Sequence, residues 1–482
     1  MSEQGSDTSK PFRVVVVGAG IVGLTLAHAL QLAKIDHVVL EKHREIVSLR
    51  GAALIVWPGM ARTLDQFGFL NKIIETTTRI TKECNRWPDG SIANGHGNMQ
   101  ELSKIFDIPD ILFDRQTLVQ HLYENLPDRS KIQVNKRVES VEHTEEGVRV
   151  RLDDGSVEEG SIVIGADGVH SKVRDFMWDY ASQTDAASIV EADRNTFSAE
   201  YGGLFGVSNH KDEFHMGPSE SNVIYGHGTT KLLFSQPGTV YWAVMFPIGK
   251  SQPPKRLPSG EEDMEKVAAQ LADISMTETI KFGDLWSNRR RAGLINLEEG
   301  VAKKWHAGRI VLVGDSASKM TADLGMGANL AVESAVTLCN ILHREVKSNP
   351  NRHFSVDELD KLFAEYQKAR FDRCSAYVDL SGKVTRMRAW NTYFGRFMIS
   401  YVAPLINHSR MMDFAKSLAQ APKLDYVPVQ TINEDAEGWK LADKTKKDDA
   451  VSSTWLAYVV LTSTVGVSLA YAASTGLLPT LL

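Results

Sequence analysis

Arg13-Val14-Val15-Val16-Val17-Gly18-Ala19-Gly20-Ile21-Val22-Gly23 is the stretch that decides the fold of this chain. A β-branched run of strand length stops at Gly-x-Gly-x-x-Gly, and the apolar residues that follow have helical spacing. Gly18 permits a tight turn, Gly20 lets the backbone approach a pyrophosphate, and Gly23 lets the helix pack closely on the strand. The N–H groups and the dipole at the helix start favour phosphate. The stretch therefore predicts a βαβ unit that binds a dinucleotide.

A second apolar run, His37-Val38-Val39-Leu40, ends in Glu41, close to the ~20-residue spacing of the dinucleotide fingerprint. An acid at the end of this strand can accept hydrogen bonds from a ribose. The alternative is a glycine-rich turn in an ordinary βαβ unit that binds nothing. Strand, helix, second strand and terminal acid occur in the right order, and this favours the nucleotide site.

Two further strands end in the same way. Ser161-Ile162-Val163-Ile164 runs into Gly165-Ala166-Asp167-Gly168, and Arg309-Ile310-Val311-Leu312-Val313 runs into Gly314-Asp315. Ligands of open α/β sheets bind at the carboxyl ends of the strands. We therefore expect the three glycine corners to meet at one edge of a parallel sheet, around one ligand.

Composition limits the other classes of function. The chain has 482 residues, enough for two or three domains, and 43% of them are hydrophobic. A net charge of −6 does not indicate a nucleic-acid-binding protein, which would carry a basic surface. The 3 cysteines have no paired spacing, which argues against disulfides and zinc and favours a reducing compartment. We find no Ser-His-Asp pattern, no metal-ligand cluster and no sign of a stable protein partner.

The two ends of the chain differ from the rest. Residues 1–11 are polar and are predicted to be disordered, without a signal peptide. No charged residue follows Asp449, and the apolar stretch within 452–478 is long enough to cross a ~30 Å hydrocarbon core. We interpret 452–478 as a single-pass membrane anchor, with the catalytic part in the cytosol and the endoplasmic reticulum as the expected membrane. The alternative is a buried helix or an unstructured tail.

In their order, the three glycine corners resemble those of the single-component FAD-dependent monooxygenases, the aromatic-hydroxylase-like flavoproteins. More narrowly, the chain resembles the fungal monooxygenases of indole-diterpene and meroterpenoid biosynthesis, the paxilline type. This resemblance covers residues 12–345 well and the helical region after them loosely. The residues that carry it are Glu41, Gly51-Ala52, Arg115, the stretch 164–174, and Gly325-Met326-Gly327-Ala328-Asn329.

The resemblance implies a set of FAD-binding residues. Those that would hold the ADP half are Gly18, Gly20, Gly23 and Glu41. Those that would lie along the rest of the cofactor are Arg115 at the phosphate or ribityl region, Asp315 at a ribityl hydroxyl, Gly327 and Ala328 at the flavin, and Asp167 with Gly168 at the passage of FAD and the nicotinamide. Ile55 stands at a position where the family has a small residue, so its contact would run through the backbone. Near the flavin ring this chain departs from the family at Ser318, Ala322 and Met326.

The fold class that follows is α/β. It combines a Rossmann-like FAD-binding domain, which has a parallel sheet, with an inserted, mostly antiparallel β substrate domain, a helical C-terminal region and the C-terminal transmembrane helix. The predicted segments are 12–80, 111–185 and 300–350 for the FAD-binding domain, 81–110 and 186–299 for the substrate domain, and 351–440 for the helical region. Within the helical region, 397–406 is apolar enough to touch a membrane surface, although a core helix is the better interpretation.

The resemblance also implies a reaction. NADPH would reduce FAD, and dioxygen would then supply one oxygen atom to an electron-rich carbon of the substrate. A second Gly-x-Gly-x-x-Gly is absent, so NADPH would bind transiently. We predict epoxidation of an alkene in a prenylated, lipophilic secondary-metabolite intermediate, which suits a membrane-anchored enzyme. Arg194 and Tyr225, expected on the sheet of the substrate domain, are the candidates for orienting the substrate or donating a hydrogen bond.

Three alternatives remain open from the sequence. The first is hydroxylation of an aromatic or terpenoid substrate. The second is a non-catalytic carrier of prenylated proteins on the same scaffold, which would be expected to lose the Gly314-Asp315 motif that this chain keeps. The third, a flavin halogenase, would be expected to carry a Trp-x-Trp-x-x-Pro type of segment, and none is found.

Overall fold

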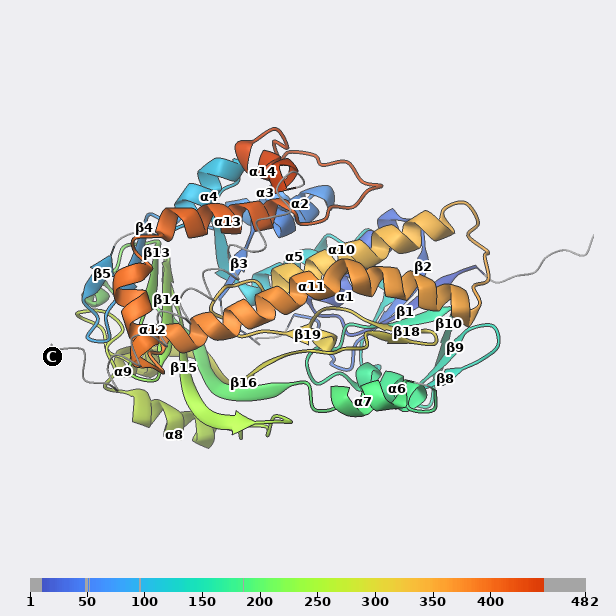
Figure 1. Cartoon of the computed structure of the whole chain (residues 1–482), viewed down its shortest axis with the longest axis horizontal. Helices are drawn as coiled ribbons and strands as arrows, with labels where there is room; N and C mark the ends of the chain where they lie inside the picture. The colour runs from blue at the N-terminus through green and yellow to red at the C-terminus, as the bar shows by residue number, and fades with distance from the viewer. Residues whose placement is uncertain (1–10, 48–50, 52, 95–96, 185, 446–482) are drawn as a thin grey trace, which may run out of the picture.

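The computed structural model describes residues 11–47, 51, 53–94, 97–184 and 186–445. Two sheets lie toward opposite ends of the long axis, and a long helix, α11 (Val356–Arg388), runs across both of them (Figure 1). The predicted disordered segment 1–11 lies outside the described residues except for Pro11.

The first sheet is built around the fingerprint strand. In spatial order its strands are β17 (His306–Ala307), β18 (Ile310–Leu312), β11 (Ile162–Gly165), β1 (Arg13–Val17), β2 (Asp36–Leu40) and β7 (Ile132–Gln133). All neighbours are parallel except β17 and β18. The central strands are apolar and buried, as expected for a parallel sheet covered on both faces. The helices packed around it are α1 (Ile21–Leu32), α5 (Arg115–Glu124), α6 (Lys172–Ala181) and α10 (Gly327–Val346).

The second sheet is larger. In spatial order its strands are β19 (Ser318–Lys319), β16 (Arg289–Val301), β12 (Ser198–Asn209), β15 (Thr239–Ser251), β14 (Thr230–Gln236), β13 (Glu220–Ile224), β4 (Lys82–Arg86) and β5 (Ile92–Asn94). Only β13 and β4 pair in parallel. The sheet thus combines strands from 82–94 with the long β meander beyond residue 198. The domain boundaries drawn from the sequence stay a prediction.

Strand alternation gives this second sheet two different faces. Leu204, Leu233 and Trp242 point to one side, where they form a core with α8 (Glu261–Leu271) and α9 (Phe282–Ser287). Their chain neighbours Phe205 and Ala243 line a cavity on the other side. Because successive side chains of a strand point to opposite faces, the sheet holds an apolar core and an apolar cavity wall with the same strands.

Smaller elements complete the framework. The remaining strands are β3 (Ala53–Val56), β6 (Ile111–Asp114), β8 (Val138–His143), β9 (Val148–Leu152) and β10 (Val157–Gly160). The remaining helices before residue 350 are α2 (Pro58–Gln66), α3 (Leu70–Glu75), α4 (Met99–Phe106) and α7 (Ala187–Asp193). Those after α11 are α12 (Tyr393–Phe397), the π-helical turn η4 (Met398–Val402), α13 (Asn407–Ala419) and α14 (Glu437–Thr445).

Helix α11 fixes the two sheets relative to each other. Its 33 residues span about 50 Å at 1.5 Å per residue. It begins with a capping box, in which Ser355 and Glu358 satisfy each other's backbone N–H groups. Near its middle, the Tyr366 hydroxyl donates to the Leu312 carbonyl of β18 at 3.2 Å. Near its end, Arg386 pairs with Glu200 and Glu299 of the second sheet.

The prediction of fold class needs one correction. No helix in the described part of the chain is long and apolar enough to cross a bilayer. The segment 452–478, assigned above to a transmembrane anchor, lies outside the described residues. The transmembrane helix is therefore not supported, and neither is the membrane localisation, which rested on that helix.

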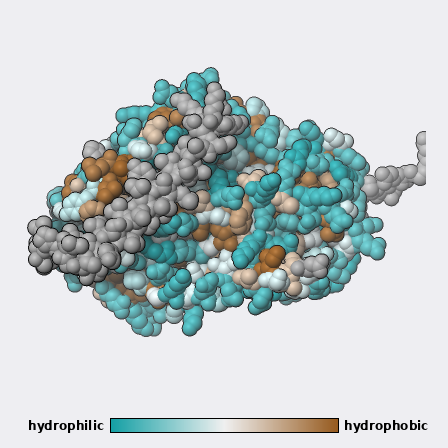
Figure 2. Space-filling model, in the orientation of Figure 1, coloured by the Kyte–Doolittle hydropathy of each residue, from teal (hydrophilic) through white to brown (hydrophobic). Residues whose placement is uncertain are grey.

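The expectation of a core helix at 397–406 is also wrong. Phe397, Tyr401 and Leu405 are 47%, 67% and 85% exposed. Figure 2 shows hydrophobic residues gathered at this end of the molecule, while most of the visible face is hydrophilic. The apolar residues here occur at a bend, where η4 interrupts the α-helical spacing, so they do not form one inward-facing stripe.

His28 in α1 leads to a prediction about stability and pH. Its ring is 2% exposed, stacks on Phe67 and lies 2.7 Å from the Leu122 carbonyl. Burial lowers the pKa of His28 from 6.5 to about 4, against the smaller opposing effect of its hydrogen bond to Leu122. Between pH 6.5 and pH 4, His28 therefore binds a proton in the unfolded chain but not in the folded chain. Stability from this group is complete above pH 6.5 and falls as the pH drops toward 4.

We expect His28→Gln, which keeps a donor for Leu122 but does not titrate, to reduce the acid sensitivity of the fold. Between pH 7.5 and pH 5.0 the variant should lose about 2 kcal/mol less free energy of unfolding than the original chain. Urea unfolding at the two pH values measures this difference. His408→Gln, at an exposed position on α13, is the control and should leave the pH dependence unchanged. Parallel curves for the original chain and His28→Gln would contradict the assignment.

Candidate active site

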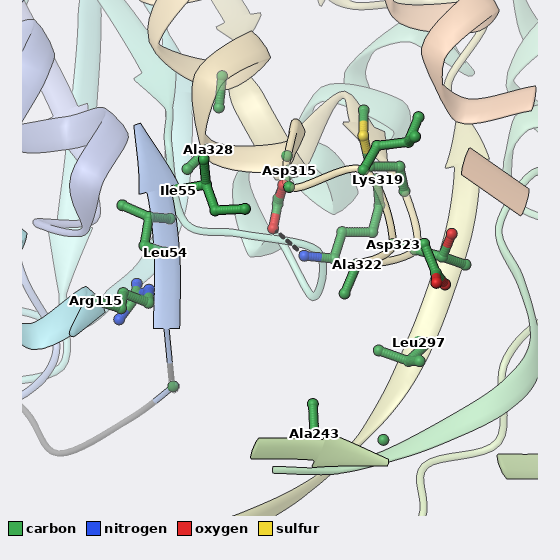
Figure 3. Close-up of a pocket in the computed structure, with 18 of the residues that line it drawn as sticks. Leu54, Ile55, Arg115, Ala243, Leu297, Asp315, Lys319, Ala322, Asp323 and Ala328 are labelled. Carbon is green, nitrogen blue, oxygen red and sulfur yellow. Dashed lines mark hydrogen bonds and ion pairs between the residues drawn. The ribbon is translucent and has the colours of Figure 1, made fainter. Parts of the chain in front are cut away.

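A cavity of about 2740 Å³ lies between the two sheets. One wall is the carboxyl edge of the parallel sheet, and another is the apolar face of the second sheet. Pockets for small ligands measure roughly 300–1,000 Å³, so this cavity has room for a large cofactor and a second molecule together. Figure 3 shows part of it, with Ile55 and Arg115 on one side and Ala243 and Leu297 across the space.

The three glycine corners meet along one edge, as the sequence predicts. Val17 pairs with Leu40 on one side and with Gly165 on the other, and Gly165 pairs with Leu312. The strands thus end in register, and the residues just beyond them emerge side by side. Those that line the cavity include Gly18, Gly20, Glu41, Asp167, Gly168 and Asp315.

Close backbone contacts explain two of the fingerprint glycines. A Cβ atom on Gly23 would lie 1.8 Å from the Gly18 carbonyl oxygen. Gly18 has a φ of +102°, and its Cβ would lie 2.7 Å from the Ala166 carbonyl oxygen at the second corner. Gly18 therefore packs the first and second corners together, while Gly23 sets the distance between α1 and β1.

Glu41 holds the fingerprint turn in shape. Its carboxylate accepts hydrogen bonds from the backbone N–H groups of Ala19 and His43, both at 2.9 Å. The acid at the end of β2 is thus fixed beside the turn between β1 and α1, at the cavity wall. Its predicted contact with a ribose stays a prediction.

Two helices begin at the cavity wall without a side-chain cap. The N-cap of α1 is Gly20, and the N-cap of α10 is Met326. Gly327 and Ala328 form the first turn of α10 and line the cavity. Free N–H groups and the positive end of a helix dipole attract anions and polar oxygens. The chain therefore offers two such helix starts on one wall, which fits an elongated phosphate-bearing ligand.

Asp315 is bound to a residue that the sequence analysis missed. It lies in the 3-10 turn η3 (Gly314–Ser316), and its carboxylate is 2.5 Å from the Lys319 ammonium. Both side chains line the cavity, and Figure 3 shows them pointing toward each other. A lysine four residues after an acid is common on helical surfaces, so no sequence pattern marked Lys319 as part of the site.

The carboxylate of Asp167 is already used by the protein. It accepts hydrogen bonds from the Ser171 hydroxyl at 2.5 Å and from the backbone N–H groups of Lys172 and Val173 at 2.7 and 3.2 Å. These residues begin α6. Burial raises the pKa of Asp167, an effect larger than the opposing hydrogen bonds. Asp167 thus lines the cavity while it caps a helix, and its role toward a cofactor stays a prediction.

Ile55 and Arg115 lie on the wall opposite the second sheet. Ile55 lies in β3, and its carbonyl accepts a hydrogen bond from the Asn329 side chain of α10 at 2.9 Å. Arg115 is the first residue of α5, whose N-cap is Asp114. Its side chain lies against Gly51, and its terminal nitrogen is 4.0 Å from the Cβ position of Gly20. The guanidinium therefore lies beside the start of α1, where a phosphate is expected.

The two candidate catalytic residues have different positions. Tyr225 follows β13, lines the cavity and packs edge-on against Trp87 at 6.3 Å. Arg194 does not lie on the second sheet, and that expectation is wrong. It caps the end of α7, is 39% exposed, and pairs with Asp179 at 2.8 Å. The long β meander of the second sheet begins only at Ser198, with β12, so Arg194 precedes it. Arg194 does not line the cavity.

The end of α11 brings in further charged residues that the sequence analysis did not name. Asp323, Arg388 and Arg410 line the cavity near Tyr225. Arg388 and Arg410 come from the helical C-terminal region. An amphipathic helix pattern does not tell which polar residue faces a distant sheet, so no sequence signal marked them.

Comparison with known proteins agrees with this geometry. The profile of the FAD binding domain family matches residues 12–353. The chain is 35% identical over 431 residues to the FAD-dependent monooxygenase esdpE of Penicillium shearii, which covers 89% of this chain and 88% of that protein. It is 33% identical over 464 residues to the FAD-dependent monooxygenase penE of Penicillium thymicola, which covers 93% and 95%.

Solved structures show the same fold. Klebsiella pneumoniae HpxO, complexed with FAD and uric acid, matches with a TM-score of 0.65 at 21% identity, over 86% of this chain and 100% of that one. The 2,6-dihydroxypyridine-3-hydroxylase of Arthrobacter nicotinovorans matches with a TM-score of 0.62 at 18% identity, over 80% and 95%. At these identities the likeness supports the fold alone.

Proposed function

This chain belongs to the family of FAD-dependent monooxygenases, and from that premise we propose that it epoxidises an alkene of a prenylated, lipophilic secondary-metabolite intermediate, with NAD(P)H and dioxygen as co-substrates. The family resemblance drawn from the sequence motifs is thereby confirmed. The observation that carries the proposal is the cavity between the sheets, which has the glycine corners on one wall and apolar side chains of the second sheet on another.

The residues present fit FAD. The start of α1 with Arg115 beside it suits the pyrophosphate, and Glu41 suits the adenosine ribose. Asp315 and the start of α10 suit the ribityl chain and the flavin. When bound, FAD supplies electron transfer from the nicotinamide and the activation of dioxygen. The overall reaction places one oxygen atom of dioxygen on the alkene and reduces the other to water, while NAD(P)H and one proton are consumed and NAD(P)⁺ is formed.

The second sheet would hold the alkene and exclude water. Its strands bring a group of apolar side chains to the cavity wall: Val223, Leu232, Phe234, Ala243 and Leu297. An apolar wall of this kind suits a prenyl chain and would keep water away from the reacting oxygen atom. The cofactor would supply the chemistry, and these side chains would orient the alkene.

Tyr225 is the residue that we propose to act near the reacting oxygen. Burial raises the pKa of its phenol, against the smaller opposing effect of Arg388 and Arg410, so the hydroxyl keeps its proton at neutral pH. A protonated phenol can donate a hydrogen bond to an oxygen atom of the substrate. Arg194 is not part of this proposal, because its side chain is paired at the surface.

A direct test uses the purified full chain. It should be yellow, bleach on addition of NADPH under anaerobic conditions, and add one oxygen atom to a farnesylated aromatic compound when air is admitted. Acid hydrolysis of the product to a diol would identify an epoxide, and an unchanged alcohol would identify hydroxylation instead. A colourless chain that takes up no added FAD would rule out the monooxygenase and support the carrier.

Asp315→Ala should remove activity while leaving the fold intact. The change deletes the carboxylate expected at the ribityl chain and leaves the Lys319 ammonium without its partner at the cofactor. We expect NADPH and oxygen consumption to fall at least 100-fold, with thermal unfolding little changed. Asp273→Ala, which breaks an exposed ion pair with Lys281, is the control and should keep full activity. Normal turnover by Asp315→Ala would exclude this role.

A further inference from the structure

One of the arginine side chains near the end of α11 has an acidic partner, and another has none among the described residues. Arg388, the last residue of α11, is tied to the second sheet because its carbonyl accepts a hydrogen bond from the Gly226 N–H at 2.8 Å. Arg410 lies on α13 and lines the same cavity. Two guanidinium groups therefore lie at the cavity wall, which Tyr225, the residue before Gly226, also lines.

The charge of Arg388 has a partner. Asp323 has a fully buried side chain, and its carboxylate accepts a hydrogen bond from Arg388 at 3.1 Å. The same carboxylate accepts from the hydroxyl groups of Thr385 at 2.5 Å and Thr230 at 3.2 Å. These three donors use both carboxylate oxygens. Asp323 thus neutralises Arg388 and is fully engaged.

The charge of Arg410 has no such partner. Within the residues described by the structure, its guanidinium makes no hydrogen bond or ion pair. The nearby acid on its own helix, Asp413, pairs with Lys416 at 3.3 Å. Burial lowers the pKa of Arg410, and so does repulsion from Arg388. A guanidinium nevertheless stays charged, so the protein keeps a cation at the cavity wall that it does not neutralise itself.

We propose that Arg410 binds an ionised oxygen acid of the substrate, a carboxylate or an acidic enol, and so orients the prenyl chain for oxidation. A guanidinium offers two parallel N–H groups to such a pair of oxygens. The Tyr225 hydroxyl, which makes no hydrogen bond within the described residues, adds a further donor at the same wall. An amphiphile with an acidic head and a prenyl tail then matches both the cation and the apolar wall. This inference rests on the proposed function, because it names the substrate class of the same cavity.

A matched pair of probes tests the assignment. A farnesyl-substituted benzoic acid and its methyl ester differ in charge and share the same tail. Each is titrated into the FAD-loaded chain, followed by the change in flavin absorbance and, independently, by calorimetry. We expect the acid to bind about 10- to 100-fold more tightly than the ester, as a charge-assisted hydrogen-bonded pair would provide. Arg410→Gln should remove this preference and leave ester binding and FAD retention unchanged.

A control variant makes the result specific. Arg396→Gln removes the same charge from α12, where the guanidinium lies over Trp390 outside the cavity, and it should keep the preference for the acid. Arg410→Lys should keep part of it. Equal binding of acid and ester by the original chain would overturn the inference, and so would failure to bind either probe.

Other outcomes separate this inference from the proposed function. If Arg410→Gln weakened only the binding of NADPH, the cation would serve the nicotinamide cofactor and the inference would be wrong. If the chain oxidised neutral prenylated compounds without preference for acids, the monooxygenase would stand and only the inference would fall. If the FAD-loaded chain preferred the acid to the ester but oxidised neither compound, Arg410 would stand as an acid-binding residue, and both the proposed oxidation and the orienting role would fall.

Discussion

Gly23→Ala is expected to abolish flavin binding and to destabilise the fold. Alanine normally favours a helix over glycine, so a gain of about 1 kcal/mol would be expected if α1 had free space at this position. Here the new Cβ would lie 1.8 Å from the Gly18 carbonyl oxygen and 2.9 Å from the Gly18 carbonyl carbon. Both atoms are backbone, so no side chain can move aside, and α1 must shift away from β1.

The expected loss is large on both measurements. The shift displaces the N–H groups at the start of α1 from the phosphate position, and we expect FAD affinity to fall at least 100-fold by fluorescence titration. We expect the free energy of unfolding to fall by about 3 kcal/mol, the upper range for a forced backbone rearrangement. Gly238→Ala is the control for flavin binding: it lies in a hairpin turn with nothing within 4 Å of its Cβ position, and it should leave FAD affinity unchanged. Its φ of +70° means that alanine there should cost about 1 kcal/mol of stability without any steric clash. A yellow, stable Gly23→Ala protein would show that the turn is looser than described.

Glu333→Gln is expected to cause the largest loss of stability on the helical side of the molecule. Glu333 of α10 is 3% exposed and accepts hydrogen bonds from Arg370 at 2.8 Å and from Arg373 at 2.8 and 3.0 Å. Burial alone would raise the pKa of Glu333, but the two guanidinium groups outweigh it and lower the pKa. The carboxylate is therefore charged, and it joins α10 to α11.

Removal of this charge leaves two arginine side chains in the interior without their anion. Loss of one member of a buried ion pair costs about 3–5 kcal/mol, and we expect a reduction of that size in urea unfolding. Glu365→Gln is the matched control on α11, because Glu365 pairs with Arg344 at the surface and should cost less than about 1 kcal/mol. Equal effects for the two variants would show that the interior site is solvated.

The contact between α10 and α11 also supports one wall of the cavity. Helix α11 carries Arg388 at its end, and Arg373 donates in addition to Ser417 of α13, the helix that carries Arg410. A weaker contact between α10 and α11 should therefore loosen the wall that holds both arginines. Glu333→Gln at a temperature where it stays folded is expected to bind acid and ester probes with less discrimination than Glu365→Gln.

The cofactor side of the site could be predicted from the sequence because its signals are local. Gly18, Gly20 and Gly23 fall within one turn, and Glu41 ends the next strand, so the sequence alone places them at one end of a βαβ unit. The Gly-Asp corner at Asp315 follows the same rule, and the structure brings it to the same edge. Because the carboxyl ends of parallel strands lie at one edge of the sheet, this rule also places residues that are far apart in the sequence.

The substrate side could not be predicted in the same way. Arg194 and Tyr225 stand in a similar sequence context near predicted strands, yet only Tyr225 faces the cavity. The difference depends on α7, whose end turns Arg194 toward Asp179. Arg410 follows Arg388 by 22 positions along the chain, and only the bend through α12 and η4 brings both to one wall.

The sequence by itself determined the parallel sheet, the glycine corners and the kind of cofactor that they bind, because these depend on backbone geometry that a few glycines and one acid encode. The tertiary structure alone decided which charges remain unpaired at the cavity. Asp323 turns toward Arg388 and the threonines, Lys319 turns toward Asp315, and Arg410 is left facing the cavity. The pairing of charges depends on distances between side chains of different elements, and such distances exist only after the sheets and helices have packed.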